Sequence, residues 1–165
     1  MASVQRIVPC LWFDDRAEEA AKFYVSVFRN SRINEISRYS EAGQEVHGRK
    51  PGSVMVVSFD LDGQSFTALN GGPQFKFTEA ISLQIMCDNQ REVDHYWEEL
   101  IAGGGEEGPC GWLKDKYGLS WQIVPDGLIE LLGDADTEKA ARTAQAMYKM
   151  TKLDMAALER VHAGE

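Results

Sequence analysis

Apolar residues recur along this chain in two similar series, each beginning with a strand and continuing with a helix. Residues 7–13 form a short apolar run rich in strand formers, and apolar positions then repeat at helical spacing from Ala17 to Phe28. The second series has a strand over residues 81–87 and an amphipathic helix over residues 93–101. The pattern therefore predicts two βα units.

Three further strands are predicted after each helix. In the first series they cover residues 33–39, 54–61 and 64–69. The last two are joined at Asp62 and Gly63, a favoured hairpin turn. An exposed loop rich in glycine and charge is expected before them, over residues 41–52. In the second series the strands fall near residues 106–108, 111–114 and 119–124.

The last strand has two faces of different chemistry. Leu119, Trp121 and Ile123 point to one face, where a helix would cover them. The other face carries a small hydroxyl, an amide and an aliphatic side chain: Ser120, Gln122 and Val124. Polar groups of this kind suit the wall of a cavity better than a core.

The two series repeat each other in detail. Asp15 and Glu18 have the spacing of a helix capping box, and Asn89 and Glu92 repeat it 74 residues further on. An aromatic pair on each helix also corresponds, Phe23-Tyr24 with Tyr96-Trp97. A chance likeness between two βα units is the alternative. A true repeat predicts two βαβββ units whose uncovered faces curve around a shared cavity.

The C-terminal part of the chain is predicted to be helical. Leucines near residues 128–132 precede an amphipathic series that starts near Asp136, and a last helix is expected over residues 153–161. We therefore predict an α+β domain over residues 1–126, built from units 4–75 and 80–126 around a curved mixed sheet. A helical extension is predicted over residues 127–165.

Composition excludes several classes of function. With 165 residues, 44% of them hydrophobic, and a formal net charge of −9, the chain can bury a core but lacks the cationic surface that nucleic acids require. No apolar run approaches the length of a membrane span, and residues 1–6 lack the features of a signal peptide, so we expect a cytoplasmic protein. Three widely spaced cysteines predict reduced, mostly buried thiols.

These patterns carry a resemblance to a known superfamily. The paired units, residues 8–20 with Phe23-Tyr24, and residues 115–124 resemble the glyoxalase/bleomycin-resistance/dioxygenase proteins, also called vicinal oxygen chelate proteins. The tail over residues 141–158 makes the chain most similar to the PhnB-like branch. The resemblance implies a small-molecule ligand in the cavity between the units and a homodimer.

The resemblance also indicates where the ligands of a metal site would lie in this chain. Metal-using members take His, Glu or Gln ligands from the inward faces of equivalent strands. Carried over to this chain, the four places are Val8, Ala68, Ser82 and Gln122. Only Gln122 offers a usable ligand, and a divalent ion normally needs three or more. We therefore expect neither metal nor cofactor, with a divalent-metal lyase or dioxygenase of the same fold as the alternative.

The branch is sometimes labelled a 3-demethylubiquinone-9 3-methyltransferase family. A donor of the adenosyl type usually lies on a glycine-rich turn from strand to helix. The glycine run 103–105 follows a helix instead and precedes Glu106 and Glu107, which is typical of a helix end and loop. The residues therefore give no support to methyl transfer.

Candidate ligand-binding residues follow from the expected inward faces. We predict that six side chains contact a ligand: Cys10, Trp12, Asn70, Ser82, Gln84 and Gln122. Gln84 and Gln122 have an alternative role as buried amides that hydrogen-bond to each other. Trp12, Trp112 and Tyr117 either stack on a flat ligand or contact a second copy of the chain. No catalytic residue is assigned.

Nucleophilic and histidine chemistry are disfavoured. Cys10 has no base or cation next to it on its strand, so a packed thiol is expected. His47, His95 and His162 lack metal-binding spacing. The sequence thus predicts a glyoxalase-like small-molecule-binding protein acting by sequestration or weak catalysis, and it leaves open whether the protein is an enzyme. A structural protein with a closed core is the third class.

Overall fold

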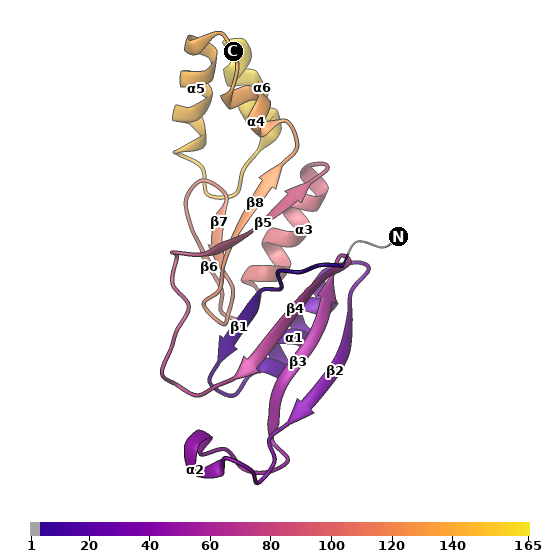
Figure 1. The fold of residues 1–165 in the computed structure, drawn as a ribbon. Coiled ribbons are helices and arrows are strands. Elements are labelled where there is room, and N and C mark those ends of the chain that lie inside the picture. The colour runs from indigo at the N-terminus through magenta and orange to yellow at the C-terminus, as the bar shows by residue number, and fades with distance from the viewer. Residues whose placement is uncertain (1–3) are drawn as a thin grey trace. The chain divides into compact units, whose positions relative to one another are not determined.

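The computed structural model describes residues 4–165, and the chain divides into two compact units. One unit reaches to Phe77 and the other runs from Thr78 to Glu165. Each unit contains one four-stranded mixed sheet and a helix that covers one of its faces (Figure 1). The predicted α+β class and the paired βαβββ units are confirmed.

The first unit follows the predicted order of elements. They are β1 (Cys10–Phe13), α1 (Ala17–Val27), β2 (Arg32–Arg38), α2 (Gln44–His47), β3 (Val54–Leu61) and β4 (Gln64–Asn70). The strand order is β1-β4-β3-β2, with β1 parallel to β4 and the other pairs antiparallel. Asp62 and Gly63 form the predicted hairpin, and both have positive φ, as a turn that matches strand twist requires. The short helix α2 lies within the predicted loop.

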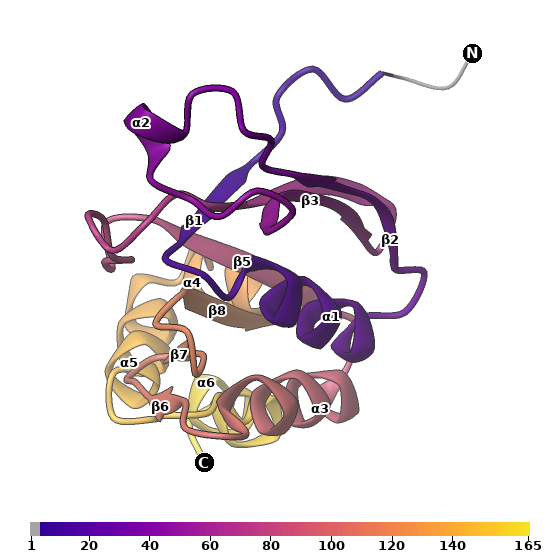
Figure 2. The same cartoon turned by 90° about the horizontal axis from the view of Figure 1, so that it is seen from below.

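The core of the first unit lies between α1 and one face of this sheet, as Figure 2 shows from below. Tyr24 of α1 stacks on Phe59 of β3 with ring centroids 6.4 Å apart. Leu11, Phe13 and Ala68 share this face and are buried. The opposite face of the sheet carries the alternate residues of each strand.

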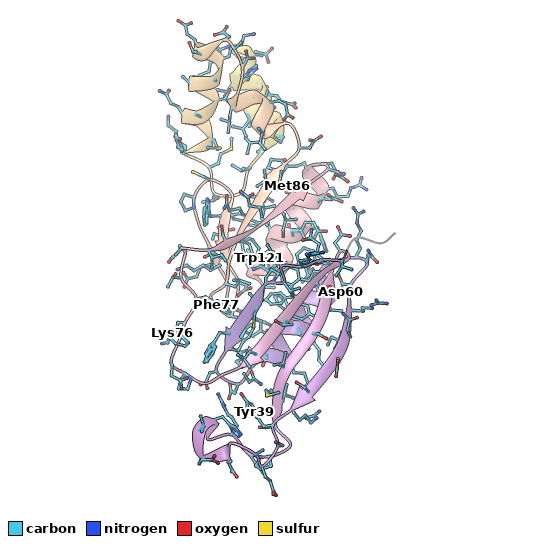
Figure 3. All side chains as sticks on the ribbon, in the orientation of Figure 1. Tyr39, Asp60, Lys76, Phe77, Met86 and Trp121 are labelled. Atoms are coloured by element: carbon cyan, nitrogen blue, oxygen red, sulfur yellow. The ribbon has the colours of Figure 1, made fainter. Side chains whose placement is uncertain are left out.

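The second unit repeats the arrangement with shorter outer strands. Its elements are β5 (Ser82–Cys87), α3 (Gln90–Ile101), β6 (Glu106–Glu107), β7 (Trp112–Lys114), β8 (Ser120–Pro125), α4 (Leu128–Leu132), α5 (Thr137–Met147) and α6 (Met155–Ala163). The strand order is β5-β8-β7-β6, with β5 parallel to β8. Leu119, Trp121 and Ile123 are buried on the side of the sheet that α3 covers, as the pattern predicts, and Trp97 of α3 is buried as well. Figure 3 labels Trp121 on β8 and Met86 on β5.

The three C-terminal helices pack onto the second unit around Leu128, Leu153 and Leu158. Gln90, at the start of α3, binds the segment before α6 twice: its amide donates to the Leu153 carbonyl at 2.9 Å and accepts from the Met155 amide at 3.1 Å. These bonds hold the helices against the end of the sheet.

The two helices begin differently, which corrects one prediction. Asn89 caps α3 by accepting from the Glu92 amide at 3.1 Å, as predicted. Asp15 was expected to cap α1, but the N-cap of α1 is Arg16 and its side chain makes no capping bond. The Asn70 side chain, from β4, accepts from the Ala17 amide at 2.8 Å instead. The capping group of α1 thus comes from a strand far along the chain.

Within residues 4–165, no helix combines the length and the apolar character needed to cross a membrane. Residues 1–3, part of the segment for which no signal peptide is predicted, lie outside the described range.

Candidate functional site

A buried carboxylate organises the turn that begins β8. Asp115 is 2% exposed, and its Oδ1 accepts from the Tyr117 amide at 2.9 Å and the Leu119 amide at 3.1 Å. Its Oδ2 accepts from the indole nitrogen of Trp121 at 2.9 Å. Three donors satisfy the carboxylate and fix the direction in which β8 leaves the turn. Fixing β8 also fixes which of its residues face away from α3.

We call the face of this sheet opposite α3 its open face. Its side chains change from charged to apolar along the direction of β8. The strand register places Ser82, Ser120, Lys114 and Glu106 in one row across β5, β8, β7 and β6. Directly opposed residues share a face, so all four belong to the open face. Lys114 forms an ion pair with Glu79, which raises the pKa of Lys114 and lowers that of Glu79.

The second row of the open face is polar but uncharged. It contains Gln84, Gln122 and Trp112 at paired positions of β5, β8 and β7. The Gln122 amide donates to the Ser82 hydroxyl at 2.8 Å, and the Gln84 amide donates to the Gln122 oxygen at 3.4 Å. The hydrogen bond between the two glutamines, one of the alternatives from the sequence, is therefore present. Gln84 is nevertheless exposed, so the pair lies at a surface rather than in a core.

The third row is apolar and meets the C-terminal helices. Met86 and Val124 form it, and Met86 is 58% exposed. A hollow of about 380 Å³ lies over the second and third rows. It is completed by residues of the β6–β7 loop and of the C-terminal segment: Cys110, Leu128, Ile129, Met147, Tyr148 and Leu153. Aliphatic and aromatic side chains with two amides make a lining typical of small-molecule sites.

A second hollow, of about 430 Å³, lies at the charged end of the same unit. Glu79, Lys114 and Ser120 contribute to it, and it shares Cys110 and Trp112 with the first hollow. Ser120 is 1% exposed, and its hydroxyl is the one buried side-chain polar atom of residues 4–165 without a hydrogen-bond partner.

Three of the predicted site residues come together on this face, namely Ser82, Gln84 and Gln122. Two others, Cys10 and Trp12, lie on β1 in the first unit, on the face opposite α1. Cys10 is exposed, which contradicts the expected packed thiol. An exposed position follows from the alternation of β1, in which Leu11 and Phe13 take the core face.

Asn70 and Ala68 lie on the other face from the one predicted. Ala68 pairs with Leu11, so both belong to the face that α1 covers, and Asn70 follows it there. The Asn70 amide is occupied by the Ala17 amide and by the Val54 carbonyl, to which it donates at 3.2 Å. The prediction was displaced by one residue, and a displacement of one residue moves a strand's side chains to the opposite face.

The ring of Trp12 is already held by its own unit. Its indole nitrogen donates to the Gly72 carbonyl at 2.9 Å, and Phe75 packs against the ring edge at 4.9 Å between centroids. A Cβ at Gly71 would lie 2.3 Å from the ring, so glycine is required there. These contacts position Trp12 without a ligand.

The residues present do not fit a divalent metal. Val8 and Ala68 offer no donor, and the alternative on β4, Thr67, offers one neutral hydroxyl. The Gln122 side chain is engaged by Ser82 and Gln84 on both of its polar atoms. No cluster of three His, Cys, Asp or Glu side chains suited to a metal occurs within residues 4–165.

The histidines take structural positions outside this face. His47 packs on the Tyr39 ring at 4.6 Å, and His162 contacts Asp134 at 2.9 Å. His95 is exposed on α3. Tyr117 lies in the turn before β8, within 5.5 Å of the Lys116 ammonium.

Sequence reasoning missed two residues that shape the site. The role of Asp115 could have been suspected, because an aspartate followed by a glycine turn often binds the amides after it. The role of Lys114 in a row with Ser120 had no sequence signal, since it depends on the pairing of β7 with β8.

The fold defines the class of protein. The chain resembles the fosfomycin resistance protein FosX from Listeria monocytogenes, with 17% identity over 79% of this chain and 98% of that chain and a TM-score of 0.51. A protein from Pseudomonas aeruginosa is similar at 17% identity over 75% and 100% of the two chains, with a TM-score of 0.58. The chain therefore shares the fold of these two proteins.

The family within this class is also defined. The profile of the family described as 3-demethylubiquinone-9 3-methyltransferase matches residues 5–124, and the chain belongs to that family. A putative 3-demethylubiquinone-9 3-methyltransferase, the PhnB protein from Bacillus cereus, is 37% identical over 73% of this chain and 99% of that chain, with a TM-score of 0.63. No curated protein sequence matches the chain.

Proposed function

We propose that this protein binds a small organic molecule on the open face of its second sheet, without a metal ion. The observation that carries the proposal is the 380 Å³ hollow over the Gln84–Gln122 pair, with Trp112 on one side and the C-terminal helices on the other. A pocket of this size, apolar with a few fixed polar groups, matches the usual anatomy of ligand sites.

The polar groups of the hollow are already oriented. The Ser82 hydroxyl holds the Gln122 amide nitrogen at 2.8 Å, which leaves the Gln122 oxygen with only a long bond from Gln84. A ligand donor that replaces the 3.4 Å bond would gain a shorter one. Gln84 and Gln122, which line the hollow, are therefore the proposed ligand contacts in this unit. Ser82 holds the Gln122 amide in place, and its own contact with a ligand stays a prediction from the sequence. Contacts from Cys10 and Trp12 remain predictions from the sequence.

A metal-dependent lyase or dioxygenase is disfavoured by the donor chemistry. One amide, already hydrogen-bonded, is a poor basis for binding a divalent cation. Metal analysis of protein purified without chelator tests the point. A stoichiometric transition metal that is lost in Gln122→Ala would contradict the proposal.

Methyl transfer, which the family description names, finds no structural support in this chain. The turns into the long helices α1 and α3, residues 14–16 and 88–89, contain no glycine and are acidic. The turn from β8 into the five-residue helix α4 contains a single glycine, Gly127, next to Asp126. The glycine run 103–105 ends α3, and Gly103 and Gly104 have positive φ. A phosphate-bearing or adenosyl donor would need backbone amides at a helix start that small residues leave open. Absence of methyl transfer from S-adenosylmethionine to a quinol acceptor is the expected result.

The proposal is tested by a thermal-shift screen of a small-molecule library. Ligands that bind the native state stabilise it by RT ln(1 + L/Kd), where L is the free ligand concentration, and therefore raise the melting temperature as their concentration increases. Hits are expected to lose their shift in Trp112→Ala, which removes a wall of the hollow. Glu130→Ala, an exposed change on α4, is the control. Absence of any hit would favour the third class, a structural protein.

The homodimer implied by the resemblance stays a prediction. Ile129 and Tyr148 are 64% and 67% exposed, and a second copy is one means of covering them. Analytical ultracentrifugation of the wild-type chain and of Tyr148→Glu would detect a dimer that depends on this surface.

A further inference from the structure

The charged hollow next to the proposed site contains an unsatisfied group. The Ser120 hydroxyl is buried and without a partner, although Ser120 lines the hollow. A buried hydroxyl in a native protein normally has a partner, so an unpaired one beside open space indicates where a ligand atom would bind. A serine hydroxyl both donates and accepts, and its neighbours decide which role is used.

The neighbour of Ser120 in the same row is a cation. Lys114 lies directly opposite Ser120 in the β7–β8 pairing. Among the residues of 4–165 that line this hollow, Lys114 is the one lysine or arginine. An ammonium and a hydroxyl donor side by side form a suitable pair for an anion, because both can donate to it.

The carboxylate of Glu79 shows which anion fits. Its oxygen pairs with the Lys114 ammonium, and its side chain is 62% exposed. An exposed ion pair contributes little to stability, so a competing carboxylate can displace it at small cost. Glu79 comes from the segment before β5 and is not buried, which leaves it free to turn toward solvent.

The graded face continues from this anion position. The rows that contain Ser120 and Val124 are about 13 Å apart, at roughly 3.3 Å per residue of strand. Trp112 and Cys110 line both hollows and connect them. A molecule with an anionic end at Lys114 would therefore lay its apolar body over Trp112 toward Met86 and Val124.

We propose that the ligand is a carboxylate with an aromatic or aliphatic body, which binds Lys114 and Ser120 in place of Glu79. The proposal rests on the proposed function, since the apolar body occupies the same hollow. Glu79 then competes with the ligand, because its carboxylate pairs with the Lys114 ammonium when no ligand is bound.

The test uses three probes with the same body: 4-phenylbutyrate, 4-phenyl-1-butanol and 4-phenylbutylamine, titrated by calorimetry at pH 7.5. We expect the carboxylate to bind about 10-fold more tightly than the alcohol, and the amine to bind weakest, because one charged contact contributes this order of free energy. Lys114→Met should abolish the preference for the carboxylate. Ser120→Ala should weaken the carboxylate several-fold.

The decisive variant is Glu79→Gln, which should bind the carboxylate several-fold more tightly than wild type and leave the alcohol unchanged. Glu98→Gln, an exposed change on α3, alters the net charge equally and should change affinity less than about 2-fold, since exposed charges at a distance are screened. Equal affinity for the carboxylate in Glu79→Gln and Glu98→Gln would overturn the proposal.

The outcomes separate this inference from the proposed function. Equal binding of all three probes, weakened by Trp112→Ala, would overturn the anion position and leave the small-molecule site standing. If the amine binds most tightly, the ligand contacts the carboxylates Glu79 and Glu106 rather than Lys114. That result would also overturn the anion position. Binding of no probe to wild type or Glu79→Gln, together with an empty library screen, would overturn both.

Discussion

The two units share one order of elements but use their open sheet faces differently. In the first unit β2 and β3 have seven and eight residues, whereas the equivalent β6 and β7 of the second unit have two and three. The second unit has shorter outer strands and, in addition, three C-terminal helices that the first unit lacks. Those helices and the β6–β7 loop wall the hollow of about 380 Å³ on its open face.

This difference shows that two units with the same order of elements can present different surfaces on the sheet face that no helix of the unit's own βαβββ repeat covers. The helix-covered face is similar in both units, because each must bury aliphatic and aromatic side chains under one helix. The open face is not constrained in this way. In the second unit it carries a charged, a polar and an apolar row, which suits a ligand with chemically different ends.

The largest contrast expected from the two faces is in thiol reactivity. Cys10 lies on an open face and is exposed, whereas Cys87 lies under α3 and is buried. Burial, with smaller contributions from Glu92 and Asp88, raises the pKa of Cys87 from 9.0 to about 12. At pH 8 the raised pKa alone lowers the thiolate fraction about 1,000-fold.

The measurement is labelling with a chromogenic disulfide reagent in a Cys110→Ser background. One thiol should react at once in the native protein, and the second should react only after unfolding in denaturant. Rapid native reaction of both thiols would show that the face under α3 opens.

The next effect concerns the turn that fixes β8. Asp115→Ala leaves two backbone amides and the Trp121 indole without their acceptor, so a loss of about 3 kcal/mol in unfolding free energy is expected. Asp126→Ala, at the exposed end of the same strand, should cost no more than about 0.5 kcal/mol. Urea denaturation gives both values. Equal stability of the two variants would show that the Asp115 carboxylate does not hold the turn before β8.

A third prediction compares the two helix starts. Asn70→Ala removes a buried amide that joins β4 to α1, and it should cost about 2–3 kcal/mol. Asn89→Ala removes an exposed local cap and should cost about 1 kcal/mol. Both are measured by urea denaturation. A larger loss of unfolding free energy in Asn89→Ala than in Asn70→Ala would contradict the inference that the long-range cap from β4 stabilises the fold more than the local cap.

The smallest effect concerns the attachment of the extension. The Lys152 ammonium binds Asp94 at 2.8 Å and lowers the pKa of Asp94 below its ordinary value of 3.8, with help from Gln90. A lowered folded-state pKa stabilises the fold above that value, and the contribution is lost as pH falls through the folded-state pKa. Because Asp94 is 42% exposed, we expect less than about 0.5 kcal/mol.

Asp94→Asn should therefore lose this small contribution at pH 6, and its difference from wild type should shrink as pH falls below 3.8, with Glu98→Gln as the control on the same helix. A loss of 2 kcal/mol, or a difference that grows as pH falls, would contradict the assignment.

The sequence predicted most of the fold because its information is local. Strand alternation, the Asp62–Gly63 turn and the Asn89 cap each depend on residues close together in the chain. The faces of Ala68 and Asn70 were predicted wrongly because register depends on which strand lies alongside, and β1 pairs with β4 across 57 residues at Cys10 and Thr67.

The candidate site was predicted in part for the same reason. Ser82, Gln84 and Gln122 share one face, as alternation on β5 and β8 predicts, and their contact with a ligand stays a prediction. Lys114 and the unsatisfied Ser120 hydroxyl depend on the pairing of a three-residue strand, which has too little pattern to fix its register.

We propose that the ligand binds to the open face of the second unit rather than to that of the first. The most direct test of this proposal is the affinity of the strongest library hit for Gln122→Ala and for Thr67→Ala, the residue at the equivalent place in the first unit. At least a 10-fold loss of affinity is expected in Gln122→Ala and less than a 2-fold change in Thr67→Ala, both measured by calorimetry. Equal losses, or a larger loss in Thr67→Ala, would contradict it.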